Sequence, residues 1–198
     1  MTEAAAKRVI VVSGPSGVGK STIIHRVLEE DAELRLSVSS TTRPPRPGEE
    51  HARDYFFVDR KQFKESIAAN AFLEWAQVYD NYYGTALQHV QDILADGHHA
   101  LLDIDTQGTL SIKRACSGVV YVFVMPPSVE ILAERLRLRG SESDRSFSSR
   151  MARAEHEMSF QSEYDYTVVN KELDSAVADF RHILDVEKAK PIRFQRSI

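Results

Sequence analysis

The chain has 198 residues, of which 42% are hydrophobic and 27% are charged, and 25 Lys and Arg against 29 Asp and Glu give a formal net charge of −4. This length suffices for one sizeable core with inserted lobes, and the charge balance gives no reason to expect a nucleic acid or a membrane as partner. No apolar run approaches the ~18 residues of a membrane span, the start lacks the apolar core of a secretory signal, and the single Cys116 fits a reducing cytoplasm.

The first element is a β-branched run at residues 9–12, VIVV, which predicts a strand buried on both faces. It leads into GPSGVGKS at 14–21, which fits G-x-x-x-x-G-K-[ST] at every fixed position, and a helix is expected over 22–30. In this order, the glycine-rich loop turns backbone N–H groups around a phosphate at the positive end of the helix. The motif predicts a nucleoside triphosphate site, with Lys20 on the outer phosphates and the Ser21 hydroxyl placed for Mg²⁺.

Residues 39–48, SSTTRPPRPG, follow a second strand expected at 34–39 and are polar, basic and rich in proline. They cannot continue a core strand or helix. Arg43 and Arg46 lie three apart in this stiff loop, where two guanidinium groups suit a phosphate; a solvated basic loop is the alternative. We favour phosphate binding, because hydroxyl side chains lie nearby and the phosphate-binding loop lies upstream.

Residues 39–85 as a whole predict a small α+β lobe inserted into an α/β core. Asp59 is suited to cap the helix of this lobe, with Gln62 as its partner in a capping box. Glu74 stands in an apolar run beside Trp75, and the pattern alone does not distinguish a carboxylate in solvent from one that binds a ligand. In chain order, the lobe is expected to contain a strand at 54–58, a helix at 60–70, a strand at 72–79 and a turn at 81–84.

The core resumes after the lobe, and one of its strands, expected at 100–105, ends in Asp103 and Asp105. Open α/β sheets bind ligands at this edge. An acid here commonly holds Mg²⁺ directly or through water, and carboxylates are suitable acceptors for the N1–H and N2–H₂ edge of guanine. Strands that alternate with helices predict a parallel sheet covered on both sides. The other expected elements are helices at 87–94, 109–115, 129–139, 150–163 and 173–188, strands at 119–125 and 167–169, a surface turn at His98 and His99, and a polar loop at 140–149.

Five arginines follow the Pro-Pro break at 126–127: Arg135, Arg137, Arg139, Arg150 and Arg153. A charged helical face is the usual interpretation for most of them. A flexible lid is the alternative, because phosphoryl transfer needs positive charge brought to the spread-out phosphate oxygens. The resulting organisation is a core at 1–38, 86–127 and 164–198, a lobe at 39–85 and a lid at 128–163.

These residues together resemble the guanylate kinase family, which phosphorylates GMP. The resemblance implies a P-loop NTPase core of three layers around a five-stranded parallel sheet, an inserted α+β GMP-binding lobe and a helical lid. It also implies transfer of the γ-phosphoryl group of ATP to GMP and dGMP, with Mg²⁺, in purine nucleotide recycling. The matching stretches, in family order, are GPSGVGKST (14–22), VSSTTRPPRPGE (38–49), DYFFV (54–58), FLEWAQVYDNYYGT (72–85), LLDIDTQG (101–108), FVMPPS (123–128), RLRLRGSES (135–143) and VVN (168–170).

The resemblance further implies a role for each matching polar residue. Lys20, Arg139 and Arg150 would be catalytic, with the two arginines crossing from the lid to the transferring phosphate. Ser21 and Asp103 would hold Mg²⁺, the aspartate directly or through water. The ATP site would comprise Gly14, Pro15, Ser16, Gly17, Val18, Gly19, Lys20, Ser21 and Thr22, with Asn170 where the family contacts the donor adenine; Ser39, Arg43, Arg46, Tyr55 and Tyr83 would hold the GMP phosphate, and Glu74, Thr85 and Asp105 would read the guanine.

Two positions depart from the family pattern. Ala52 stands where a glycine is common, and Thr106 stands where a bulkier residue is often found. Neither touches an expected contact group, so neither argues against activity.

Two other functions compete with this interpretation. The first is a kinase for another monophosphate or a phosphorylated sugar, against which the guanine-reading acids argue. The second is a scaffold module that binds phosphorylated partners; such modules typically have damaged phosphate loops, whereas Gly14, Gly19, Lys20 and Ser21 are all present here. The sequence does not distinguish a monomer from a homodimer.

Overall fold

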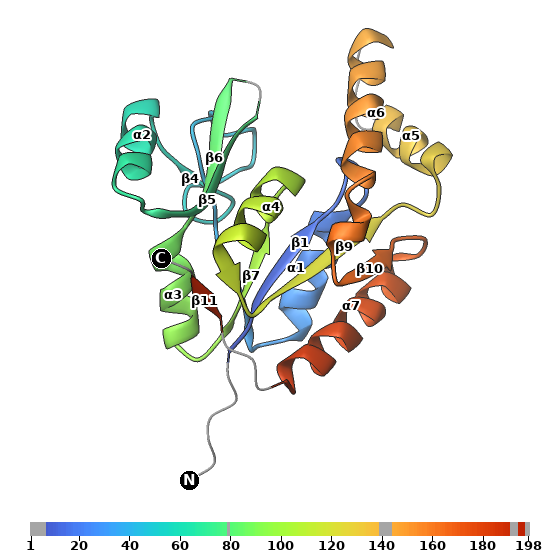
Figure 1. Cartoon of the computed structure of the whole chain (residues 1–198). Helices are drawn as coiled ribbons and strands as arrows, with labels where there is room; N and C mark the ends of the chain where they lie inside the picture. Colours follow the sequence, from blue (N-terminus) through green and yellow to red (C-terminus); the bar gives the residue numbers. More distant parts are fainter. Residues whose placement is uncertain (1–6, 79, 139–143, 191–193, 197–198) are drawn as a thin grey trace.

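A parallel sheet lies at the centre of the computed structural model, which describes residues 7–78, 80–138, 144–190 and 194–196 (Figure 1). Within these residues the sheet has five strands in the order β10-β9-β1-β7-β2, all paired in parallel. The predicted five-stranded parallel sheet is therefore confirmed. Its strands are β1 (Val9–Ser13), β2 (Leu34–Leu36), β7 (His99–Asp103), β9 (Val119–Met125) and β10 (Tyr166–Val169).

Helices cover both faces of this sheet, because β1 presents alternate apolar side chains to each side. Ile10 and Val12 belong to the cluster that contains residues of α1 (Lys20–Glu30) and α7 (Leu173–Lys188). Val9 and Val11 belong to a second cluster, with residues of the other two core helices. The three-layer arrangement follows from this alternation. The helices of the second face are α3 (Leu87–Ala95) and α4 (Thr106–Ala115).

The inserted lobe contains a second sheet, of strand order β4-β3-β6-β5, and one helix, α2 (Arg60–Ala68). The capping box is confirmed: the Gln62 backbone N–H donates to Asp59 Oδ1 at 2.7 Å, and the Asp59 N–H donates to Gln62 Oε1 at 3.0 Å. Phe63 of α2 is buried and stacks on rings from the sheet, which joins the helix to it. The strands are β3 (Ser40–Thr41), β4 (Phe56–Phe57), β5 (Phe72–Val78) and β6 (Asn81–Ala86).

The turn expected at 81–84 is wrong, since these residues open β6. Tyr83 pairs with Ala76 and Gly84 with Trp75 in an antiparallel ladder with β5. The Asn and Gly residues suggested a turn, but the two tyrosines between them favour a strand once a partner strand is present. This pairing turns Tyr83 and Thr85 toward the functional site.

The segment predicted as a lid (128–163, called the lid below) contains α5 (Val129–Leu138), α6 (Asp144–Met158) and the short 3₁₀ helix η1 (Gln161–Glu163). Ser128 accepts from the N–H of Ile131 at 3.3 Å, as expected of an N-cap. The loop expected at 140–149 is wrong from residue 144 onward, and the helix expected to reach 163 ends at Met158. The cause is an apolar stripe on α6 that packs against α5 and outweighs the low helix propensity of the serines. The stripe consists of Phe147, Met151, Ala154 and Met158, which are at helical spacing.

Figure 1 shows the lobe and the lid on opposite sides of the sheet edge at which β1 leads into α1. His99, expected on a surface turn, instead begins β7 and is 2% exposed. No helix in the described part of the chain is long and apolar enough to cross a membrane. A two-stranded antiparallel ribbon, β8 (Cys116–Ser117) with β11 (Gln195–Arg196), completes the described elements.

Candidate functional site

The glycine-rich loop runs between the end of β1 and the start of α1. Gly19 occupies the N-cap position of α1 with φ of +93°, a conformation that favours glycine. A Cβ on Gly14 would lie 2.4 Å from the carbonyl oxygen of Val124, so the loop passes directly against β9. The loop lines a cavity of about 250 Å³ together with Asp105 and Glu157. Its residues from Gly14 to Ser21 thus surround a space of the kind predicted for phosphates.

Two polar side chains from outside the loop support its backbone. Asn170 is buried and donates from Nδ2 to the carbonyl oxygen of Val18 at 2.8 Å. Arg135 donates to the same carbonyl at 3.3 Å and to the carbonyl oxygen of Asn170 at 3.0 Å. Asn170, expected at the donor adenine, therefore has a supporting role in this structure, and its contact with adenine stays a prediction. Arg135 is better explained as a brace for the loop than as part of a charged helical face.

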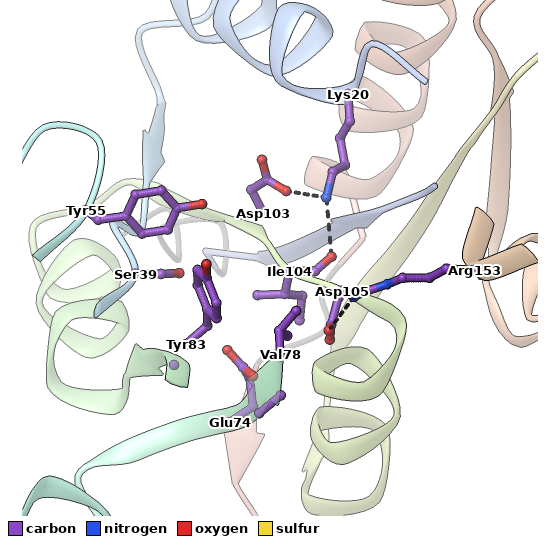
Figure 2. Close-up of a pocket in the computed structure, with 12 residues that line it drawn as sticks. Lys20, Ser39, Tyr55, Glu74, Val78, Tyr83, Asp103, Ile104, Asp105 and Arg153 are labelled. Carbon is purple, nitrogen blue, oxygen red and sulfur yellow. Dashed lines mark hydrogen bonds and ion pairs between the residues drawn. The ribbon is translucent and has the colours of Figure 1, made fainter. Parts of the chain in front are cut away.

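Lys20 joins the loop to the end of β7 by an ion pair with Asp103 and a hydrogen bond of 3.4 Å to the carbonyl oxygen of Ile104 (Figure 2). The strand expected to reach Asp105 ends at Asp103, and Asp105 instead caps α4, which begins at Thr106. Its Oδ1 accepts from the N–H of Gly108 at 2.9 Å. The two acids therefore serve different partners: Asp103 lies against Lys20, and Asp105 holds the start of α4.

A second cavity, of about 220 Å³, lies between the lobe and the core. Figure 2 shows Lys20 and Asp103 on one side of it, Glu74 on the opposite side, and Arg153 entering from α6. The lobe therefore brings its predicted substrate-binding groups to the carboxyl edge of the sheet. The predicted site residues that line this cavity are Lys20, Ser39, Tyr55, Glu74, Tyr83, Asp103 and Asp105.

Glu74 is 8% exposed, which decides against a carboxylate in solvent. Its Oε1 accepts from the Thr85 hydroxyl at 2.7 Å and from the Thr85 N–H at 3.1 Å. Burial raises the pKa of Glu74 to about 7; the bonds from Thr85 oppose that rise and the nearby Asp105 adds to it. Gly108 permits this placement, since a Cβ there would lie 2.6 Å from Glu74 Oε2. Thr85 itself is fully buried and orients Glu74.

The two arginines of the basic loop have different surroundings. Arg43 donates to Glu49 Oε1 at 2.9 Å, and its guanidinium lies 5.5 Å from the ring centre of Tyr55. Arg46 is exposed and lines a third cavity, of about 260 Å³, whose lining includes Ser21, Ser39, Tyr55 and Asp103. Burial raises the pKa of Tyr55 to about 12, helped by Asp103 and Tyr83, so its hydroxyl remains a donor at neutral pH. Arg46 thus lies near the predicted phosphate site. Arg43 is held by the carboxylate of Glu49, which lines the same cavity as Arg46.

The helix α6 contributes Arg153, one of the five arginines noted in the sequence, and Glu157, which the sequence does not single out. Arg139 lies outside the described residues, and Arg150 is half-buried on α6. Arg153, one turn further along α6, lines the second cavity, and Glu157 lines the loop cavity. The i, i+4 spacing of Arg153 and Glu157 was the signal in the sequence, and alone it would indicate only a surface ion pair.

Ser21 and Asp103 line the same cavity of about 260 Å³. A hydroxyl and a carboxylate fit Mg²⁺, which usually binds one or two carboxylates together with water and substrate phosphates. Among the described residues no cluster of three or more His, Cys, Asp or Glu is arranged to hold a metal. The Ser21 hydroxyl and the Asp103 carboxylate thus fit a Mg²⁺ ion whose other ligands are water and substrate phosphates.

Comparisons with known proteins point to one family. Its model, described as guanylate kinase, matches residues 6–187. The guanylate kinase of Zymomonas mobilis subsp. mobilis is 48% identical over 181 residues, which cover 91% of this chain and 84% of that protein. The guanylate kinase of Caldanaerobacter subterraneus subsp. tengcongensis is 44% identical over 181 residues, which cover 91% of this chain and 88% of that protein. The crystal structure of guanylate kinase from Anaplasma phagocytophilum has a TM-score of 0.77 at 30% identity, covering 98% of this chain and 92% of that one.

Proposed function

Since the chain belongs to the guanylate kinase family and is an ATP:GMP phosphotransferase, we propose that the cavities around Lys20 hold the two substrates for direct in-line transfer. The observation that carries this proposal is that Lys20 lines both the loop cavity and the cavity between lobe and core. ATP would bind in the first and GMP in the second, so that one ammonium group faces both phosphate chains. Transfer from one to the other then needs positioning and charge neutralisation, with no covalent intermediate.

On the donor side, the backbone N–H groups of the loop and the N-terminus of α1 would hold the β- and γ-phosphates of ATP. Mg²⁺, when bound, would neutralise charge on those phosphates, and Ser21 and Asp103 are the residues that would hold it, the aspartate directly or through water. Lys20 would exchange its ion pair with Asp103 for a phosphate oxygen. Asn170 and Arg135 would keep the loop backbone in place while this exchange occurs.

On the acceptor side, the basic loop and the tyrosines of the lobe would hold the phosphate of GMP. The carboxylates of Glu74 and Asp105 would accept from N1–H and N2–H₂ of guanine, an edge that adenine does not present. Thr85 would fix the orientation of Glu74 by its two hydrogen bonds. An acceptor without these donors would leave a buried carboxylate unpaired, which is the basis of selectivity. The phosphate contacts would come from Ser39, Arg43, Arg46, Tyr55 and Tyr83.

The lobe (39–85) and the lid (128–163) would close over the core (1–38, 86–127 and 164–198) and exclude water, which otherwise accepts the phosphoryl group. Arg139 and Arg150 would then approach the transferring phosphoryl group, by analogy with the family. A single arginine in that position can be worth roughly 10³–10⁵ in rate. We place the enzyme in the cytoplasm, where ATP is available and a free thiol such as Cys116 stays reduced.

A coupled assay of ADP release tests the assignment, with ATP and each of GMP, dGMP, AMP, CMP and UMP as acceptor. We expect turnover with GMP and dGMP, and kcat/KM lower by at least about 10³ for the other three, since they lack the guanine donors. Comparable turnover with AMP would remove Glu74 and Asp105 from the base site. The same panel excludes or identifies a kinase for another monophosphate.

A further inference from the structure

The lid helix α6 contacts the phosphate loop through one buried carboxylate. Glu157 is 8% exposed, and its Oε2 accepts from the N–H of Ser16 at 3.3 Å. Its Oε1 accepts from Nε of Arg153 at 2.9 Å. A carboxylate that is removed from water is stable only when both oxygens have donors, and here one donor is the loop and the other is Arg153.

The other end of Arg153 reaches the guanine-binding side. Its Nη2 lies 4.0 Å from Asp105 Oδ2, across the cavity between lobe and core (Figure 2). A continuous polar chain therefore runs from the N–H of Ser16 through Glu157 and Arg153 to Asp105. One end of this chain lies in the proposed donor site and the other in the proposed acceptor site.

The contacts of Arg153 with Glu157 and with Asp105 differ in strength. Its bond to Glu157 is short and involves a buried carboxylate, which favours retention. Its contact with Asp105 is long, and the two side chains are 35% and 26% exposed, so the pair contributes little by itself. Because the weaker link is on the guanine side, Arg153 can release Asp105 while it stays bound to Glu157.

Charge brought by a triphosphate would favour that release. Glu157 lines the loop cavity, so phosphates there add negative charge beside it and strengthen the attraction of Arg153 toward the donor side. Asp105 Oδ2 would then be open to accept from guanine, while its Oδ1 continues to cap α4. Each substrate would thereby favour the binding of the other, since coupling between two sites is reciprocal.

We propose that Arg153 and Glu157 are positioning residues that couple the two substrate sites, with Arg153 shared between Glu157 and Asp105. This inference rests on the proposed assignment of the two cavities. Removal of Arg153 would leave Asp105 open at all times, so GMP would bind as well as before or better in the absence of ATP. The enhancement caused by ATP would be lost.

Calorimetric titration of GMP, with and without a non-hydrolysable ATP analogue and Mg²⁺, tests the coupling. For the unmodified protein we expect the analogue to lower the Kd of GMP at least about 5-fold, in the usual range of coupling. For Arg153→Ala the expected ratio is below about 2-fold, with GMP alone bound at least as tightly as by the unmodified protein. Glu157→Gln keeps an acceptor for Ser16 but loses the charge that attracts Arg153, and should give an intermediate ratio.

Matched controls are Arg114→Ala on α4 and Glu155→Gln on α6, both exposed, which should keep the full ratio. A full ratio in Arg153→Ala would overturn the proposal, as would an equal loss of GMP affinity with and without the analogue, because that pattern indicates a direct contact with GMP. If Arg153→Ala fails to fold, Arg153→Lys and Glu157→Gln carry the test. An unmodified protein that binds no GMP would refute the site assignment; one that turns over GMP without coupling would refute this inference alone.

Discussion

Lys20 forms an ion pair with Asp103 where the phosphate loop meets the end of β7. Arg43 is held in a similar way by Glu49 in the lobe. In both pairs a carboxylate binds a cationic side chain that is expected to bind a phosphate once substrate is present. Such pairs keep the cations in position, and their exchange for phosphate oxygens replaces one charge-assisted hydrogen bond with another.

The first prediction concerns Lys20. Lys20→Ala should lower kcat by at least about 10², while the Kd of GMP changes less than about 3-fold, because the ammonium acts on charge that develops during transfer. Steady-state ADP release gives kcat and equilibrium titration gives the Kd. Lys61→Ala, at an exposed position of α2, is the control and should match the unmodified protein. Near-normal turnover of Lys20→Ala would contradict the role assigned to this residue.

The second prediction is a pH dependence of GMP use. Burial raises the pKa of Glu74 to about 7, so the carboxylate is increasingly protonated as the pH falls from 8 to 6. The protonated form cannot accept from both guanine donors, and the KM for GMP should rise several-fold over that interval. Glu74→Gln should lower kcat/KM for GMP by about 10² or more and remove this pH dependence, since an amide can turn a donor toward N1–H. Unchanged GMP kinetics in this variant would exclude Glu74 from the base site.

The third prediction is that the same substitution stabilises the fold at high pH. A carboxyl whose pKa is raised on folding contributes stability below its unfolded pKa of about 4.5, and this contribution is lost as the pH rises through 7. Glu74→Gln should therefore exceed the unmodified protein in free energy of unfolding by about 2–3 kcal/mol at pH 8, with a much smaller difference at pH 5. Urea denaturation at the two pH values measures this. Glu65→Gln, exposed on α2, should show no such difference.

The fourth prediction concerns His99, whose Nδ1 accepts from the backbone N–H of Arg8 at 3.0 Å. Burial lowers the pKa of His99 to about 4, and Lys7 and Lys188 contribute to this. The unfolded chain binds a proton near pH 6.5 and the folded chain does not, so stability is lost as the pH falls from 6.5 toward 4.

We expect His99 to lower the free energy of unfolding by about 1.5 kcal/mol as the pH falls from 6.5 to 5. His99→Asn keeps an acceptor for Arg8 and should flatten the pH profile of the free energy of unfolding. His182→Asn, exposed on α7, is the matched control. An unchanged slope in His99→Asn would show that other groups cause the loss.

The fifth prediction uses Ala52, which has φ of +66° at an exposed position. This conformation costs a side chain with a Cβ roughly 1 kcal/mol, whereas glycine adopts it freely. Ala52→Gly should therefore raise the free energy of unfolding by up to about 1 kcal/mol. The gain is smaller than the strain relieved, because glycine also gives the unfolded chain more conformational entropy. Ala68→Gly, at the end of α2, should have the opposite sign. Thermal denaturation of the two variants distinguishes these outcomes.

Local chemistry explains which parts of the fold were predictable from the sequence. The phosphate loop, the strand 9–12 and the capping box of Asp59 depend on neighbouring residues, and each is present in the structure. The strand at 81–86 depends on pairing with β5, and the burial of His99 depends on its position within β7. Such long-range contacts leave no local pattern, so sequence reasoning assigned both to turns.

The candidate site divides in the same way. The phosphate-loop motif predicts the role of Lys20 and the end of a predicted strand singles out Asp105, whereas the role of Glu74 comes only from the resemblance; the structure brings all three to one cavity. Arg153 and Glu157 gain their meaning only from the packing of α6 against the loop. The resemblance predicts that Asn170 contacts adenine, whereas its bond to the carbonyl oxygen of Val18 depends on the folded loop and has no signal in the sequence.

The junction of lobe and core has a mechanical consequence. β6 ends at Ala86 and α3 begins at Leu87, with no linker between them, and the N–H of Leu87 donates to the carbonyl oxygen of Ala71. Any swing of the lobe must therefore twist or bend the start of α3, whose Val90 and Ile93 are packed against the sheet. In the proposed closure, the angle of the lobe would thus be set by an elastic element rather than a loose hinge, and we expect substitutions beneath α3 to alter how far the cleft opens without touching either nucleotide.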